Sequence, residues 1–367
     1  MANLEHKQQM STADFAVMVI AATFGSQFIL QTRNLIADAE QLAWLSVVLG
    51  GLACYAAACL MLALGRRFPG DSPVSYLPRL WGPFFGNVIL LWFVMVFIDM
   101  FWLGMAGFSH VVTFFMLERT PPEVVTLGML AVLVYLSLQD LGTIIRVQMF
   151  VTLVAIPIVT GVWLLSIFNF QPDYMLPLWP LKMKGILAGA VDSWSLYGGY
   201  ELVLLFLPFV CRQNTRPARA VGWAFFCVTL LFVSTVVLSV GVLTSDAAVN
   251  TPYPTMIVIR SVELPGTFVE RLENYLLFAW MPAVFSSLTM FLYIPALVCT
   301  QRWGHADHRP WVLLLAPIMF TGSVLLDNSK IIQQINEFSI AVALGFSFII
   351  IPLSLFLSWR RDKKKEG

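Results

Sequence analysis

Ten apolar runs, each long enough to cross a lipid bilayer as a helix, constrain the fold of this sequence more than any other feature. Hydrophobic residues make up 59% of the 367 positions and charged residues only 12%, a balance too apolar for a soluble domain to bury. We therefore predict an all-α polytopic membrane protein. The predicted spans cover residues 13–30, 42–64, 84–108, 121–138, 143–168, 186–210, 218–243, 272–298, 311–326 and 338–357.

The ten spans are expected to form one integral membrane domain over residues 1–367, built from two repeats of five helices. The first repeat covers residues 1–168, the second covers 186–357, and a basic tail, 358–367, would anchor the last span to anionic headgroups. When the spans alternate in direction, fifteen of the 22 Lys and Arg residues fall in connections on one side. The excess of positive charge predicts that this side, and with it both termini, is cytoplasmic.

The sixth span, residues 186–210, holds groups that a lipid-facing helix does not tolerate. Gly198 and Gly199 are adjacent, and the carboxylate of Glu201 follows them. A carboxylate at this depth costs about 2.5 to 3.5 kcal/mol, and backbone groups freed by a glycine pair need partners in protein or in a cavity. We predict a helix interrupted over residues 197–199, with Tyr200 starting its second half. A continuous helix that uses both glycines for close packing is the alternative.

The first span should carry a matching interruption if the two halves are inverted repeats. Its centre places Gly25 among the polar side chains of Thr23, Ser26 and Gln27. A lone glycine there could serve helix packing, but two interruptions in corresponding spans favour a pair of discontinuous helices.

The ends of two interrupted helices would suit a zwitterion. The amides of residues 25–27 would form the positive end of one half-helix and attract a carboxylate. The carbonyls of Trp194, Ser195 and Leu196 would end the other half-helix and attract an ammonium group. The sequence therefore predicts a site for a molecule the size of an amino acid. Glu201 would either add charge near the ammonium or cap the second half-helix, and we expect the cap.

Two other spans carry candidate wall residues. Phe97 and Phe101 lie one turn apart on the same face of the third span, and Asp99 points away from them. We expect the aromatic pair to line the site and Asp99 to bond a neighbouring helix, although ordinary packing explains the pair equally well. In the eighth span, Ser287 follows Ser286 and precedes Phe291 by one turn. These serines would face either the ligand or a sodium ion.

A connection on the outer side, residues 244–271, contains the apolar stretch 254–260. This stretch would form a short helix at the membrane surface or a segment that covers the outer mouth of the protein.

Motifs for phosphate binding, nucleophilic catalysis or metal ligation are missing from the sequence. We expect no enzymatic activity, no catalytic residue, no metal, no cofactor and no nucleic-acid partner.

The sequence resembles the B subunits of bacterial spore germinant receptors, a compact branch of the amino acid, polyamine and organocation transporter superfamily. The resemblance rests on the length, on residues 23–28 and 197–201, and most specifically on the outer stretches 252–256 and 268–273. It implies a LeuT-like fold in the inner membrane of the spore, a small germinant that is often an amino acid, and A-type and C-type partner subunits. One departure is Gln31-Thr32-Arg33, where the family often has Leu-Pro-Arg.

The resemblance and the half-helix argument together give one set of candidate ligand-binding residues. The set is Thr23, Gly25, Ser26, Gln27, Phe97, Phe101, Ser195, Tyr197, Gly198, Gly199, Tyr200, Glu201, Ser287 and Phe291. A secondary transporter that couples amino acid uptake to sodium or protons would use the same fold and site, so it remains the alternative function. A structural subunit of a channel is a third class.

Overall fold

The structure is a computed structural model that describes residues 10–25, 27–177, 179, 181–210, 216–262, 272–326 and 329–366. For residues 329–331 and 362–366 it describes the backbone only. The described residues form helices joined by short segments, and no β-strand occurs among them. Six of these helical segments are long and apolar enough to cross a membrane. This architecture fits the polytopic membrane protein that the sequence predicts.

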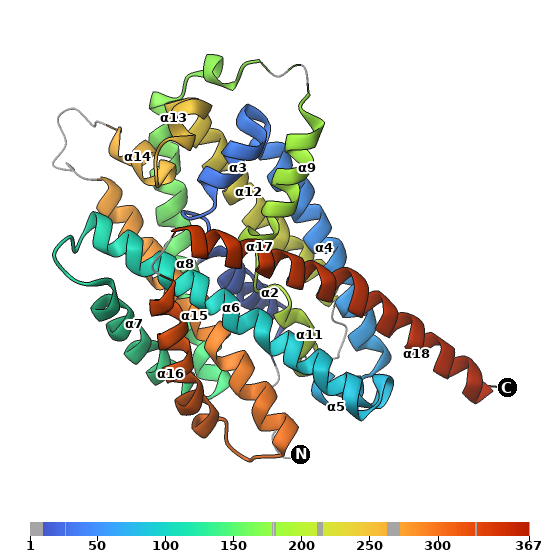
Figure 1. Ribbon diagram of the computed structural model, residues 1–367. Helices are drawn as coiled ribbons and strands as arrows, with labels where there is room; N and C mark the ends of the chain where they lie inside the picture. Colours follow the sequence, from blue (N-terminus) through green and yellow to red (C-terminus); the bar gives the residue numbers. More distant parts are fainter. Residues whose placement is uncertain are drawn as a thin grey trace.

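Every apolar run identified in the sequence contains helix in the structure (Figure 1). The helices are α2 (Thr12–Phe24), α3 (Thr32–Ala39), α4 (Ala43–Arg67), α5 (Pro73–Trp81), α6 (Pro83–Phe115), α7 (Pro122–Ser137), α8 (Leu141–Ser166), α9 (Met183–Asp192), α10 (Trp194–Tyr197), α11 (Leu202–Phe206), α12 (Pro217–Leu243), α13 (Ser245–Val249), α14 (Pro254–Arg260), α15 (Leu272–Trp303), α16 (Arg309–Leu325), α17 (Ser329–Gly345) and α18 (Ile351–Glu366).

Local sequence signals explain where several helices begin. Ser11 and Asp14 form a capping box at the start of α2, in which each side chain accepts the backbone amide of the other residue. Asp140 caps α8 by accepting the amide of Thr143 at 3.1 Å and its hydroxyl at 2.7 Å. These hydrogen bonds hold the pKa of Asp140 below its usual value. Helices α6, α7 and α12 begin with proline, which lacks an amide that would go unpaired there.

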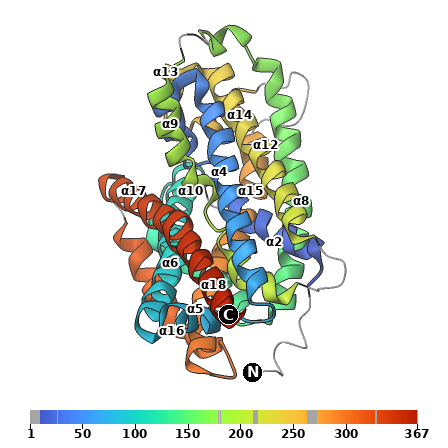
Figure 2. The same cartoon turned by 90° about the vertical axis from the view of Figure 1, so that its right-hand side faces the viewer.

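Helix α15 is the central element of the bundle. It is the most buried of the six long apolar segments, and it packs against α8, α6 and α2. Trp280 and Leu288 of α15 are completely buried. The short helix α2 lies inside the bundle, next to α15 (Figures 1 and 2). The backbone of α2 is therefore surrounded by protein and can end inside the bundle without exposing polar groups to lipid.

Helices α13 and α14 cover one end of the bundle, and α5 lies at the opposite end (Figure 1). The predicted short helix in residues 254–260 is present as α14. Its side chains Met256 and Ile259 are completely buried, because α14 packs on α12 and α15. Helix α14 therefore covers that end of the bundle. This agrees with the interpretation of residues 254–260 as a covering segment.

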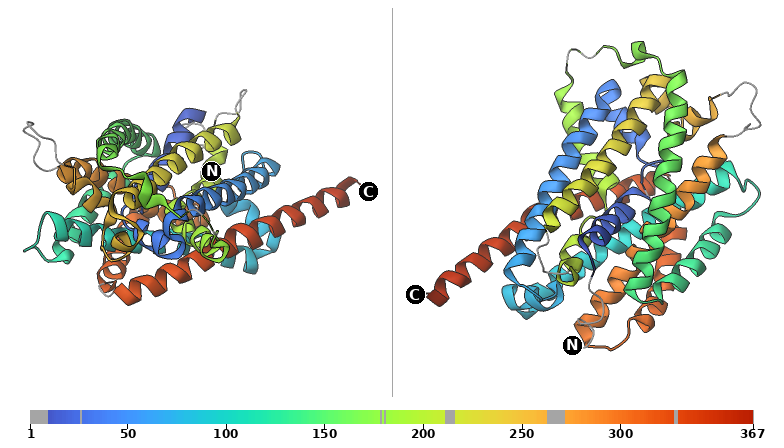
Figure 3. Two further views of the ribbon diagram at one scale, coloured as in Figure 1. Left: turned by 90° about the horizontal axis from the view of Figure 1, so that it is seen from above. Right: turned by 180° about the vertical axis from the view of Figure 1, so that it is seen from behind.

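The last helical segment is continuous from α17 through a π-helical turn, Phe346–Ile350, into α18. It runs along the side of the bundle, and the end of α18 extends beyond the other helices (Figures 1 and 3). Single π-helical turns often occur at functional sites. Here the turn contains Ser347, whose hydroxyl is completely buried against the centre of the bundle.

Candidate functional site

The first span is interrupted, as predicted. Helix α2 ends at Phe24 and α3 begins at Thr32, later than the expected start at residues 25–27. A turn separates the two helices, because the carbonyl of Gln27 accepts the amides of Leu30 at 3.1 Å and Gln31 at 3.0 Å. The predicted site residue Ser26 lies outside the described residues.

Gly25 is required by a close approach between α2 and α15. Its backbone is helical, with φ −71° and ψ −51°, so its dihedral angles would suit any residue. A Cβ atom at this position would instead overlap the carbonyl oxygen of Ala283 and the hydroxyl of Ser287. Ser287 also donates a hydrogen bond to the carbonyl of Ala21 at 2.7 Å. Gly25 therefore both allows close packing of α2 on α15 and lies where the first span is interrupted.

The sixth span is interrupted between Tyr197, the last residue of α10, and Leu202, the first residue of α11. Gly199 has φ +102°, a conformation that residues with a side chain rarely adopt. A Cβ atom there would lie 2.8 Å from Cε1 of Phe291 and 3.1 Å from the carbonyl oxygen of Ala22. The second interruption therefore packs directly against the last turn of α2 and against α15.

Glu201 bonds the interruption itself. Its side chain is completely buried, and Oε2 accepts the amide of Gly199 at 3.0 Å. The prediction that Glu201 caps the second half-helix is wrong, because its side chain makes no capping bond to α11. The carboxylate of Glu201 thus accepts an amide that precedes it in the chain, within the interruption, and not an amide of the following helix. The other oxygen, Oε1, has no hydrogen-bond partner in the described part of the chain.

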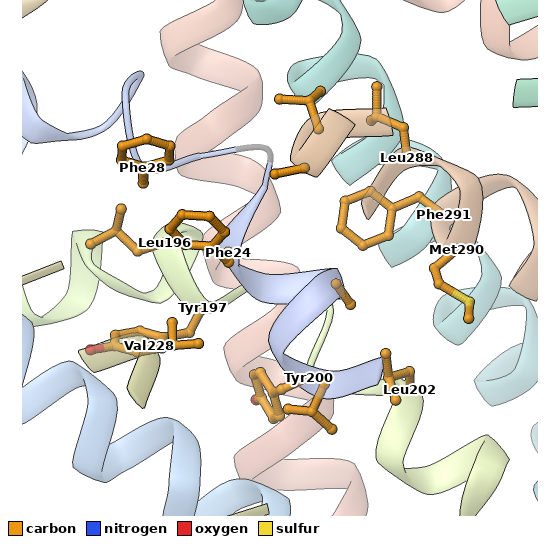
Figure 4. Close-up of a cluster of buried hydrophobic side chains, with 14 of the residues drawn as sticks. Phe24, Phe28, Leu196, Tyr197, Tyr200, Leu202, Val228, Leu288, Met290 and Phe291 are labelled. Carbon is orange, nitrogen blue, oxygen red and sulfur yellow. The ribbon is translucent and has the colours of Figure 1, made fainter. Parts of the chain in front are cut away.

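The third span contributes aromatic side chains to this region. Phe97 and Phe101 are completely buried, and the ring centroids of Phe97 and Phe291 are 6.0 Å apart. Figure 4 shows Phe291 beside the end of α2, on the side opposite Leu196. Asp99 accepts a hydrogen bond from Ser339 of α17, so the predicted bond to a neighbouring helix is confirmed.

Two predicted site residues use their hydroxyl groups to bond backbone carbonyls three or four positions earlier in the chain. Thr23 donates to the carbonyl of Val19 at 2.8 Å, and Ser195 donates to the carbonyl of Asp192 at 2.7 Å. The carbonyl of Ser195 was expected to be unpaired, but it accepts the amide of Gly198 at 3.4 Å. The turn after α10 brings that amide back toward the helix and so removes one expected acceptor.

Two tyrosines of the sixth span point toward other parts of the bundle. The hydroxyl of Tyr197 donates to the carbonyl of Val47 at 3.0 Å, and it lies 3.0 Å from the hydroxyl of Thr229. The hydroxyl of Tyr200 lies 2.7 Å from the hydroxyl of Ser347 in the π-helical turn. The two side chains fix the interruption to α4, to α12 and to the last helical segment.

The structure adds a polar contact that the sequence did not indicate. Gln31 donates to the side-chain oxygens of Gln27 at 3.4 Å and Asn336 at 3.3 Å, and all three residues are buried. Asn336 precedes the predicted tenth span, and 305 positions separate it from Gln31. Met100 was also missed; its Cε would lie 2.9 Å from a Cβ atom on Gly198. Neither contact has a local sequence signal.

Five predicted residues are thus brought together around the two interruptions: Gly25, Phe97, Gly199, Ser287 and Phe291. Four predicted residues in this region have 0% exposure: Phe97, Phe101, Tyr200 and Glu201. The region is therefore closed to solvent in this conformation. Thr23, Ser195 and Tyr197 stabilise the surrounding helices instead.

Comparison with known proteins gives one consistent result. The family of spore germination proteins matches residues 9–332 of the chain. Spore germination protein A2 of Bacillus subtilis (strain 168) is 26% identical over 322 residues, which are 85% of each chain. Spore germination protein YndE of the same organism is 23% identical over 326 residues, 88% of each chain.

A third relative covers nearly the whole molecule. Spore germination protein B2 of Bacillus subtilis (strain 168) is 23% identical over 367 residues, which are 99% of this chain and 98% of that protein. The family match alone covers well over half of the chain. The chain belongs to the spore germination protein family.

Proposed function

We propose that this chain is the germinant-sensing membrane subunit of a spore germination receptor and that it binds an amino acid where the two interrupted spans cross. The contact of Gly199 with α2 and of Gly25 with α15 carries this proposal, because it puts the ends of two discontinuous helices beside each other inside the bundle. Half-helices that end at mid-membrane bind small charged molecules in transporters built from inverted repeats.

The fold we propose is the ten-span, LeuT-like arrangement of two five-helix repeats, with spans one and six discontinuous. Both termini would be cytoplasmic, and the membrane would be the inner membrane of the spore. Family membership supports a receptor with A-type and C-type partner subunits. The α13 and α14 end of the bundle is then the outer side.

The buried state of the site sets a condition on binding. Phe97, Tyr200 and Glu201 are closed to solvent, so a ligand enters only when α2 and α15 separate or the Gly198–Glu201 turn opens. Binding energy would then favour the open arrangement over the closed one, which is how a ligand shifts a conformational equilibrium. A receptor needs this coupling, whereas passage of the ligand through the membrane is not required.

One observation favours an amino acid transporter coupled to sodium or protons as the second candidate. The carbonyls of Ala21 and Ala283 meet the hydroxyl of Ser287, and the neighbouring buried hydroxyl of Ser286 has no partner among the described residues. Backbone carbonyls and hydroxyls at a helix interruption are suitable ligands for Na⁺.

Proteoliposomes containing the chain distinguish the two functions. We expect saturable binding of tritiated neutral L-amino acids without accumulation, with or without a sodium or proton gradient. Accumulation driven by either gradient would assign the transporter instead. The absence of both binding and uptake would contradict both and favour a structural subunit.

A further inference from the structure

The carboxyl group of Glu201 is enclosed in the bundle without a charged partner. Its side chain has 0% exposure, and Oε2 accepts the amide of Gly199 at 3.0 Å, while Oε1 has no hydrogen-bond partner in the described part of the chain. Figure 4 shows its sequence neighbours Tyr200 and Leu202 within a cluster of buried hydrophobic side chains. No ion pair among the described residues involves Glu201.

The groups that face Glu201 from the surrounding elements are uncharged near neutral pH. Trp194 of α10 lies next to the carboxyl group, but its indole N–H forms no hydrogen bond within the described residues. The thiol of Cys54 in α4 and the phenol of Tyr200 are close enough to interact electrostatically with Glu201, and both side chains have 0% exposure. In α2, the single titratable residue is Asp14, which belongs to the capping box at the far end of that helix, and residues 202–209 contain none. No positive charge of the described chain therefore balances a carboxylate at position 201.

Burial makes the ionised form of this carboxyl group unfavourable. Water solvates a carboxylate strongly, and one amide hydrogen bond replaces only part of that solvation. A carboxyl group enclosed without a counter-charge keeps its proton, which removes the charge. Protonation costs none of the hydrogen bonds in the structure, because Oε2 still accepts the amide of Gly199 while the proton occupies Oε1, the oxygen without a partner.

We propose that the second interruption contains a proton-binding site, in which Oε1 of Glu201 carries a proton while the bundle is closed. At high pH the proton passes to hydroxide, which becomes water, and leaves a carboxylate that only water can solvate at this position. The ionised form therefore favours an arrangement in which water reaches the interruption. The proton is thus a ligand that stabilises the closed bundle, and opening becomes easier as the pH rises. This inference concerns the protein without a germinant, so it does not depend on the proposed function.

Infrared spectroscopy of the full chain in proteoliposomes tests the protonation state directly. In the difference spectrum between the native protein and Glu201→Gln at pH 7, we expect the carbonyl stretching band of a protonated carboxyl group, which the variant has lost. Glu118→Gln is the matched control: its carboxyl group is exposed, and an exposed glutamate is ionised at pH 7, so that variant should lose a carboxylate band instead. A carboxylate band lost in Glu201→Gln at pH 7 would overturn the proposal.

Alkylation of Cys54 measures the expected opening. The chain has five cysteines, and replacing the other four by serine makes N-ethylmaleimide report on Cys54 alone, which is completely buried in the closed bundle. In this background we expect alkylation at pH 9 to be at least fivefold faster with Glu201 than with Glu201→Gln, and the two rates to agree within twofold at pH 6.

The comparison at one pH separates opening from the chemistry of the thiol. Raising the pH ionises the Cys54 thiol in both proteins, and a negative charge on Glu201 disfavours the thiolate, so a faster reaction with Glu201 reports access. Equal rates at pH 9 would show that the proton does not hold the bundle closed and would overturn the proposal.

Discussion

The two interruptions at the centre of the bundle use glycine for different physical reasons. Gly25 has ordinary helical dihedral angles, and a side chain there is excluded by the nearby atoms of Ala283 and Ser287 in α15. Gly199 has φ +102°, so its conformation already excludes most residues before Phe291 is considered. The first interruption is therefore held by packing between helices, and the second by the local shape of the chain.

The difference indicates which interruption can move. A turn fixed by its own dihedral angles and by the bond from Gly199 to Glu201 keeps its shape when neighbours shift. The end of α2 keeps its place only while α15 remains against Gly25. We expect opening to separate α2 from α15 and to leave the Gly198–Glu201 turn largely intact.

The largest effect is expected for Gly25→Leu. The side chain overlaps the backbone of Ala283, which cannot rotate away, so leucine would fill the space between α2 and α15 that the ligand needs. We expect at least a hundredfold loss of amino acid affinity at the interruptions, measured with labelled amino acids in proteoliposomes. Size-exclusion chromatography and circular dichroism check that the variant is folded. Affinity within threefold of the native value would place the ligand elsewhere.

Gly199→Ala and Gly198→Ala form a matched pair. Alanine at position 199 adopts an unfavourable φ, which costs about 1 to 3 kcal/mol, and it also meets Phe291. Alanine at position 198 meets only the flexible end of Met100, so the loss should be below about 1 kcal/mol.

Thermal unfolding in detergent measures both glycine variants. Adding Phe291→Ala to Gly199→Ala removes the contact with Phe291 but leaves the backbone strain and the contact with the carbonyl of Ala22. Measured against Phe291→Ala alone, most of the destabilisation should therefore remain. Full recovery in the double variant would mean that packing, and not backbone conformation, fixes the second interruption.

Ser287→Ala and Ser286→Ala test the contact between α2 and α15. Ser287 donates to the carbonyl of Ala21, which loses its partner in the alanine variant, and we expect destabilisation of about 1 to 2 kcal/mol. The hydroxyl of Ser286 has no partner among the described residues, so Ser286→Ala should change stability by less than about 0.5 kcal/mol. A larger loss for Ser286→Ala that appears only in sodium buffer would instead support a bound Na⁺.

The smallest effect on amino acid affinity is expected for Glu201→Gln. The amide oxygen can still accept the amide of Gly199, so amino acid affinity should stay within about threefold, less than 1 kcal/mol. Glu201→Ala removes the acceptor and should destabilise the turn. A tenfold loss of affinity in Glu201→Gln, with unchanged thermal stability, would mean that the carboxylate pairs with the ligand's ammonium group.

The sequence predicts the helices and both interruptions well, because each depends on local composition. Apolar runs define the helices, and glycine beside polar residues marks where α2 and α10 end. Even the face of the third span follows from spacing, since Phe97 turns inward and Asp99 bonds Ser339.

Side-chain directions around the interruptions could not be derived in the same way. Tyr197 lies within the predicted site, but its hydroxyl donates to the carbonyl of Val47 on α4. The contact between Gln31 and Asn336 joins two distant segments whose approach depends on the packing of the whole bundle. Such contacts are set by tertiary structure, which local spacing does not encode.

The π-helical turn that contains Ser347 joins α17 to α18 at the point where the last helix leaves the bundle. Tyr200 bonds it on one side, and α18 leaves the bundle on the other (Figure 3). Helix α18 has 16 residues and so is about 24 Å long, which means that a tilt of about 10° at the turn swings its tip by about 4 Å. The second interruption thus contacts the point at which a small change of angle would displace the tip of α18 the most.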